Sequence, residues 1–168
     1  MTTNASTKVL DLSFRSALLR LDANGMLLKV DDEIDPEIEL SSIMFEQPER
    51  AMLFKNVKGY DMPVMGNFMG SEENVLTIFQ KDVRELRHFI TEGLGNPMPP
   101  KKVDSGVVQE VFHNNPDLTN LLPLLRYAPE DGGRYISAGV VISKDPESGV
   151  FNASYHRFMH LEQNRLLI

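Results

Sequence analysis

A short segment near the end of the sequence carries an unusual density of polar groups. The residues Asn152–Arg157 read NASYHR, which places an amide, a hydroxyl, an imidazole and a guanidinium close together. The amide oxygen of Asn152 is a hard ligand that suits Mn²⁺ or Mg²⁺. The guanidinium of Arg157 can clamp a carboxylate through two parallel hydrogen bonds. The alternatives are structural: an ordinary hairpin asparagine and a solvated strand arginine.

Strand geometry sets a condition on these two roles. In a regular strand Asn152, Ser154 and His156 share one face, while Arg157 points to the other. If both ends of the segment serve one site, we predict an irregularity between Ser154 and Arg157. His156 and His160 would stand about 13 Å apart on a strand. That is too far to bind one metal ion, so we expect surface or partly satisfied histidines.

Two β-prone runs around a turn predict the hairpin that carries this segment. Tyr135–Ser143 and Val150–Met159 are rich in β-branched and aromatic residues, and KDPESG between them contains typical turn residues. DGGR, at Asp131–Arg134, precedes the first run. Because it lacks the spacing of a nucleotide-binding motif, we interpret it as a turn that leads into the strand.

The first half of the sequence alternates helix and strand signals, which is typical of an α/β layer. Met26–Val30 and Ala51–Val57 predict short strands, and a third apolar run with glycine breaks follows at 64–70. Four helices are expected: one between Ser13 and Asn24-Gly25, one beginning at Asp35-Pro36, one after Ser71, and one over Asp82–Gly95.

A stretch rich in proline and glycine interrupts this pattern. GNPMPPKKVDSG holds three prolines and two glycines, which is typical of a domain linker. We therefore predict an α+β protein with a disordered lead-in at 1–11, an N-terminal α/β domain at 12–95, a linker at 96–106 and a β-rich domain at 107–168.

Composition excludes several classes of protein. The net charge is −7 and the 17 basic residues are scattered, so we expect no nucleic-acid partner. The absence of cysteine excludes disulfides and cysteine-based zinc sites and is compatible with a reducing compartment. We find neither a secretion signal nor an apolar run of about 18 residues, so we expect a cytoplasmic protein with no membrane span.

Three stretches taken together resemble one family. They are NVKGYDMPVMGNFMGS (56–71), DGGRYISAGVVISKDPESG (131–149) and NASYHRFMHLEQNRLLI (152–168). In this order they resemble the N-terminal part of UbiD-type decarboxylases, which remove carboxyl groups from aromatic and α,β-unsaturated acids. The likeness runs from about Leu12 to Ile168. It implies that 107–168 begins a split β-barrel that binds a flavin, and that the domain continues beyond this chain.

The resemblance also implies cofactors and roles. The cofactor would be prenylated FMN, supplied by a separate flavin prenyltransferase, with Mn²⁺ (or Mg²⁺) and often K⁺ beside its phosphate. Arg157 matches the family's catalytic arginine, and Asn152 matches the asparagine that ligates the metal. The two catalytic glutamates and the further metal ligands are expected beyond Ile168. The remaining residues expected to border the cofactor are Ser137, Ser154, Tyr155 and His156.

The function expected from this resemblance is non-oxidative decarboxylation. The substrate would be an aromatic or hydroxyaromatic acid, the other product CO₂, and the protein a homo-oligomer. One alternative is a folding or assembly module that has no activity by itself, because the glutamates are absent from this chain. Another is a plain FMN-binding split barrel.

Overall fold

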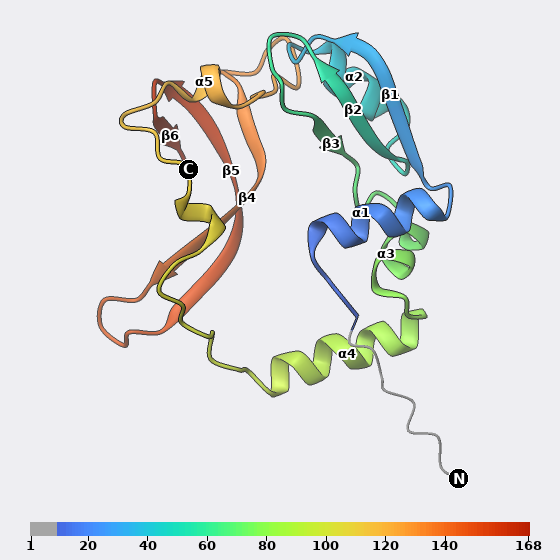
Figure 1. Ribbon diagram of the computed structural model, residues 1–168, viewed down its shortest axis with the longest axis vertical. Coiled ribbons are helices and arrows are strands. Elements are labelled where there is room, and N and C mark those ends of the chain that lie inside the picture. Colours follow the sequence, from blue (N-terminus) through green and yellow to red (C-terminus); the bar gives the residue numbers. More distant parts are fainter. Residues whose placement is uncertain (1–9) are drawn as a thin grey trace. The chain divides into compact units, whose positions relative to one another are not determined.

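The computed structural model describes residues 10–168 of the chain (Figure 1). Most of the predicted lead-in at 1–11 lies outside these described residues. Helices and strands mix along the chain and form two separate three-stranded sheets, which confirms the predicted α+β class. None of the helices in the described part is long and apolar enough to cross a membrane.

The secondary structure follows the order that Figure 1 labels. The first sheet has the strand order β1-β2-β3 and the second β4-β5-β6. The elements are α1 (Phe14–Ala23), β1 (Leu27–Ile34), α2 (Glu39–Glu46), β2 (Ala51–Val57), β3 (Val64–Gly66), α3 (Glu72–Phe79), α4 (Val83–Gly95), a short 3₁₀ helix η1 (Val107–Gln109), α5 (Leu118–Leu121), β4 (Tyr135–Lys144), β5 (Phe151–Glu162) and β6 (Arg165–Leu167).

One compact unit comprises the described residues up to 29 together with 48–53 and 65–103. The Ser13 side chain accepts a hydrogen bond from the Ser16 amide and caps α1, and Ser71 caps α3 in the same way, as the sequence predicts. The core of this unit is formed by apolar residues of α1, α3 and two strands: Ala17, Leu21, Leu27, Ala51 and Ile78.

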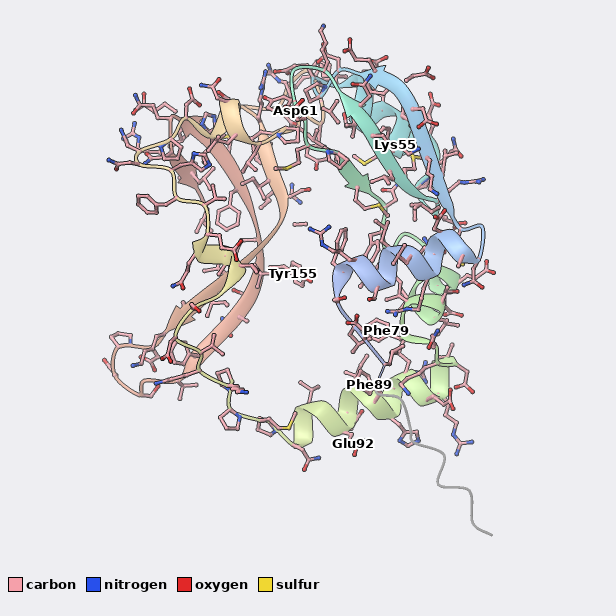
Figure 2. The ribbon with its side chains drawn as sticks, viewed as in Figure 1. Lys55, Asp61, Phe79, Phe89, Glu92 and Tyr155 are labelled. Carbon is pink, nitrogen blue, oxygen red and sulfur yellow. The ribbon has the colours of Figure 1, made fainter. Side chains whose placement is uncertain are left out.

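Helix α4 belongs to the same unit and contacts α3 through a small apolar surface. A capping box between Asp82 and Glu85 begins the helix. The rings of Phe79 and Phe89 lie 6.2 Å apart, which brings α3 and α4 together (Figure 2). None of the helix's own residues is buried, so its stability in this unit depends on the capping box and on a few contacts.

A second compact unit comprises residues 30–47, 54–64 and 104–168. Strands β1 and β2 contribute residues to both units, so the units do not follow the order of the sequence. The domain limits predicted from the sequence therefore remain a prediction. The buried apolar residues of the second unit come from α2, two strand ends and the segment before β4: Ile34, Leu40, Phe54, Val57, Leu124 and Leu125.

The second predicted helix begins later than expected. The sequence predicts a start at Asp35-Pro36, but α2 begins only at Glu39. The preceding residues pair with a distant segment instead: the Ile38 amide donates to the Arg126 carbonyl at 3.1 Å, and the Arg126 amide donates to the Pro36 carbonyl at 3.3 Å. This pairing takes the backbone groups that a first helical turn would use, so a tertiary contact overrides a local helix-start signal.

Asp35 still organises the loop that it begins. Its carboxylate accepts hydrogen bonds from the Glu37 amide and from the Lys58 ammonium. These two bonds hold the pKa of the Asp35 carboxyl below its usual range. The residue therefore acts as a local turn anchor in place of a helix cap.

A buried serine reinforces the pairing between these distant segments. Ser41 is 5% exposed, and its hydroxyl lies 2.7 Å from the Ile38 carbonyl oxygen, 3.1 Å from that of Arg126 and 3.2 Å from that of Tyr127. The hydroxyl thus lies within hydrogen-bond distance of one local acceptor and of two acceptors about 85 residues away. We define residues 36–41 and 126–135 as the docking segments.

Side-chain contacts of Arg134 and Tyr60 reinforce the pairing of the docking segments. The guanidinium of Arg134 pairs with the Glu37 carboxylate at 2.5 Å. The Tyr60 hydroxyl donates to the Thr119 carbonyl at 2.6 Å and lies 3.5 Å from an Arg134 nitrogen. Because Arg134 immediately precedes β4, these contacts fix the point at which that strand begins.

Replacing Ser41 with alanine should destabilise the protein by about 1–3 kcal/mol, because buried carbonyl groups lose a donor. The matched control is Ser42→Ala, one residue along α2. Ser42 is exposed, and its hydroxyl bonds only the local Ile38 carbonyl at 2.9 Å. Urea unfolding of both variants would check this; equal losses of stability would contradict the role given to Ser41.

Candidate functional site

The candidate site residues lie on the hairpin formed by β4 and β5 (Figure 1). The two strands pair antiparallel, with Lys144 opposite Phe151 and Ser143 opposite Asn152. The register is regular along β5 from Phe151 to His156. This confirms the hairpin that the sequence predicts and places every candidate residue on a defined face.

One face of β5 carries three of the candidates. The Ser154 hydroxyl lies 2.9 Å from Nε2 of His156, so these two side chains stand side by side. Asn152 shares this face by strand alternation and is exposed. His160 lies 3.0 Å from the Gln163 carbonyl through its Nε2 atom. Both histidines thus have partners in the protein.

The other face carries Tyr155 and Arg157. Tyr155 is 79% exposed and projects away from the sheet (Figure 2). Arg157 is also exposed, and no described residue forms a hydrogen bond or an ion pair with its guanidinium. The structure therefore distributes the candidate residues of β5 over two faces, as strand alternation requires.

The expected irregularity is present, but on the neighbouring strand. Two residues of β4, Ser137 and Ala138, lie opposite a single residue of β5, Arg157. This is a β-bulge in β4, whereas β5 itself is unbroken between Ser154 and Arg157. The predicted location was therefore wrong by one strand. Ser137 nevertheless lies directly across from Arg157.

A glycine next to the bulge allows a close packing contact. Gly139 follows the bulge, and a Cβ atom there would stand only 1.9 Å from the Phe158 ring. The ring therefore occupies the space that any other residue at 139 would fill. Glycine is thus the residue type that this approach of strand and ring requires.

A pocket opens on the Arg157 face. It has a volume of about 650 Å³ and combines one cation and one carboxylate with aromatic side chains and a hydroxyl. Its lining residues are Phe45, Tyr127, Asp131, Tyr135, Ser137 and Arg157. An unpaired guanidinium beside aromatic walls is suited to an organic carboxylate with an apolar body.

Sequence reasoning missed several of these lining residues. Tyr127, Asp131 and Phe45 carry no motif, and Asp131 was interpreted only as part of a turn. In the structure the Asp131 carboxylate accepts hydrogen bonds from the Tyr127 and Ala128 amides at 3.1 and 2.9 Å. The only sequence signal was the Asp-Gly pair, which is typical of such an anchored loop.

One edge of β5 is open beside the candidate residues. Strand β6 pairs only with Met159–Glu162, and within the described chain no strand pairs with the other edge of 151–158. Backbone donors and acceptors on that edge are therefore available. A ligand lying along an open edge can be reached by side chains of both faces, which removes the conflict between Asn152 and Arg157.

Metal ligands are scarce on this hairpin. No group of three or more His, Cys, Asp or Glu residues that could hold a metal ion occurs in the part of the chain that the structure describes. Asn152 offers a single amide oxygen, and Mn²⁺ or Mg²⁺ binds through several oxygen ligands. The described residues alone thus do not make a metal site.

Two family models match the chain in succession. The model for the 3-octaprenyl-4-hydroxybenzoate carboxy-lyase N-terminal domain (UbiD_N) matches residues 18–92. The model for the 3-octaprenyl-4-hydroxybenzoate carboxy-lyase Rift-related domain (UbiD) matches residues 101–168. Together they cover both the helix-rich first part and the hairpin that carries the candidate site.

Similar proteins include two decarboxylases. The chain is 37% identical to anhydromevalonate phosphate decarboxylase of Methanothermobacter thermautotrophicus, over 84% of this chain and 33% of that protein. It is 28% identical to gallate decarboxylase of Lactiplantibacillus plantarum, over 82% of this chain and 32% of that protein. The chain thus spans about a third of the length of the relatives that it matches.

Two solved structures are similar to the chain. The UbiD-class enzyme HmfF from Pelotomaculum thermopropionicum, in complex with FMN, is 32% identical with a TM-score of 0.84, over 92% of this chain and 36% of that one. An evolved dimeric form of HmfF in complex with prFMN has the same identity and TM-score, over 92% of this chain and 37% of that one.

Replacing Gly139 with alanine should destabilise the hairpin by about 1–3 kcal/mol, because the new methyl group must displace the Phe158 ring. Urea unfolding checks the loss. Gly106→Ala is the control, since a Cβ at Gly106 would meet its nearest neighbour at an ordinary 3.8 Å. In a Phe158→Ala background the added cost at Gly139 should disappear. An unchanged cost in that background would show that the ring is not the obstacle.

Proposed function

Because the chain belongs to the UbiD family of carboxy-lyases, we propose that it forms the N-terminal part of a prenylated-FMN-dependent decarboxylase. The substrate is an aromatic or α,β-unsaturated carboxylic acid, and CO₂ is released without net oxidation. The observation that carries this proposal is the unpaired Arg157 guanidinium, which lines an aromatic pocket beside the open edge of β5.

Arg157 binds and orients the substrate carboxylate. Its planar guanidinium can donate two parallel hydrogen bonds to the carboxylate, which fixes both the position and the plane of the group that leaves. Phe45 and Tyr135 supply aromatic walls against which the apolar body of the bound acid can pack. Within the described chain no carboxylate forms an ion pair with the guanidinium, so it is free for a ligand.

The hairpin is suited to a flavin along the open edge of β5. The backbone of 151–158 can bond the polar edge of a ring system, while Ser154 and His156 reach it from one face and Tyr155 from the other. Ser137 borders the same region through the bulge. When bound, a prenylated flavin supplies the electron sink that decarboxylation of an unactivated acid requires.

Asn152 is the residue that would approach a divalent metal. It is exposed on the Ser154 face and offers a hard amide oxygen, as Mn²⁺ or Mg²⁺ requires. The remaining ligands, any K⁺ ion and the two catalytic glutamates are assigned to no described residue. The residues in hand thus fit one ligand of such a site, and no chemical step is assigned to the metal.

The proposed function also concerns the source of the cofactor, the compartment and the oligomeric state. A flavin prenyltransferase supplies the cofactor, and the cytoplasm is a compartment compatible with a chain that has no cysteine. One of the similar structures is a dimeric form, which supports a homo-oligomer. The alternative is a folding or assembly module, and it predicts a protein without bound flavin.

The test uses the protein expressed from its complete coding sequence together with a flavin prenyltransferase. We expect a coloured protein that releases CO₂ from 4-hydroxybenzoate or cinnamate. Arg157→Ala should lower kcat/KM by about 100-fold or more, since a charge-assisted bidentate contact is lost. Arg157→Lys should recover only part of this, because an ammonium cannot reproduce the fork geometry.

The matched control is Arg165→Ala on β6, whose guanidinium pairs with Glu162. This variant should retain kcat/KM within about threefold, because surface ion pairs contribute little. A colourless, inactive wild-type protein would favour the assembly module. A coloured, active protein that is insensitive to Arg157→Ala would remove Arg157 from the mechanism.

Asn152→Ala should lower retention of Mn²⁺ by about tenfold or more and weaken flavin binding with it, because a ligand near the cofactor phosphate is lost. Metal analysis and visible absorbance after gel filtration measure both. Ser143→Ala is the control, since Ser143 is the exposed cross-strand neighbour of Asn152. Equal retention by the two variants would argue against the metal role of Asn152.

A further inference from the structure

A pair of hydroxyl groups lies beside the candidate arginine. The Tyr127 hydroxyl is 2.5 Å from the Ser137 hydroxyl, and both residues line the same pocket as Arg157. Ser137 belongs to the bulge of β4 and faces Arg157 across the ladder. The hydroxyl pair is thus next to the unpaired guanidinium, although Tyr127 and Arg157 are 30 positions apart in the sequence.

The position of Tyr127 is fixed by its backbone. Its amide donates to the Asp131 carboxylate at 3.1 Å, and its carbonyl oxygen lies 3.2 Å from the Ser41 hydroxyl. These contacts anchor the residue on both sides of its Cα atom, and both partners belong to the docking segments. Together with the bond to the Ser137 hydroxyl, they hold the phenol in place before any ligand arrives, which reduces the entropy cost of using it in recognition.

Counting hydrogens shows what this pair can do. Two hydroxyls carry two hydrogens, and one of these is used in the bond between them. The other has no further acceptor among the described residues, so it is available to an incoming ligand. Because one hydroxyl of the pair polarises the other, the outward donor is stronger than an isolated hydroxyl.

The charge of the pocket limits what the ligand can carry. Arg157 is the only cation among the lining residues, and the Asp131 carboxylate already contributes one negative charge. The two charges of the lining already cancel, so a ligand with a single carboxylate adds the smallest excess of negative charge that an anionic ligand can bring. A second anionic group, such as a phosphate, would find no further cation in this lining and would face Asp131.

We propose that Tyr127 and Ser137 form, with Arg157, a three-residue recognition site for a monocarboxylate, in which the hydroxyl pair donates to a carboxylate oxygen beside the guanidinium. Tyr127 is then a specificity-determining residue of the reaction, and this assignment rests on the function proposed above. It adds a directional donor to the charge of Arg157 and favours acids with one anionic group and a planar, apolar body.

The test is a calorimetric titration of the complete protein with benzoate. The double variant Tyr127→Phe/Ser137→Ala should bind benzoate about tenfold more weakly, since a hydrogen bond to a charged group is lost. Each single variant should lie between, because one free hydroxyl remains. Tyr60→Phe is the control: it loses the same hydroxyl, but that group donates to Thr119 outside this lining.

The outcomes separate this inference from the proposed function. Wild-type affinity for benzoate in the double variant, with an unchanged thermal unfolding midpoint, would overturn the role of the hydroxyl pair while Arg157→Ala still tests the carboxylate clamp. A wild-type protein that does not bind benzoate would overturn the recognition site, and the decarboxylation assay would then judge the function alone. Tighter binding of benzyl phosphonate than of benzoate would also overturn it, because a dianion would then be preferred.

Discussion

The structure of the second unit depends on one non-local interaction, the docking of residues 36–41 onto 126–127. Main-chain bonds in both directions join Ile38 and Pro36 to Arg126, and the buried Ser41 hydroxyl completes the contact. Buried backbone groups must find partners, so each segment satisfies the other. The Glu37–Arg134 ion pair then carries the constraint to the start of β4. Without this docking, nothing local in the sequence would place Tyr127 against the hairpin.

The hairpin resolves an apparent contradiction in the candidate site. Asn152 and Arg157 lie on opposite faces of β5, which would separate them in an ordinary sheet. The open edge of 151–158 offers a location from which both faces are accessible. Ser137, within the bulge, lies across the ladder from Arg157. Edge and bulge together account for a compact set of polar groups on a strand that is otherwise regular.

The sequence predicted what local physics determines. The caps at Ser13 and Ser71 and the β-prone runs of the hairpin all form where expected. The start of α2 was wrong, because the pairing with Arg126 lies outside any local window. The pocket walls Phe45 and Tyr127 were missed for the same reason: only the fold brings them to Ser137 and Arg157. The roles of the individual site residues rest on the resemblance and on geometry, and stay predictions.

The bulge in β4 also has a meaning for how this segment can change. Side chains alternate along a strand, so one extra residue would reverse the alternation if no bulge absorbed it. Here the pairs Ile136–Phe158 and Gly139–His156 flank the bulge, and Phe158 and His156 share one face of β5. Ile136 and Gly139 therefore share that face although they are three positions apart in the sequence. Deleting Ala138 would restore a regular ladder and keep the flanking side chains on their faces, so the extra residue serves the local geometry opposite Arg157 and not the alternation of the strand.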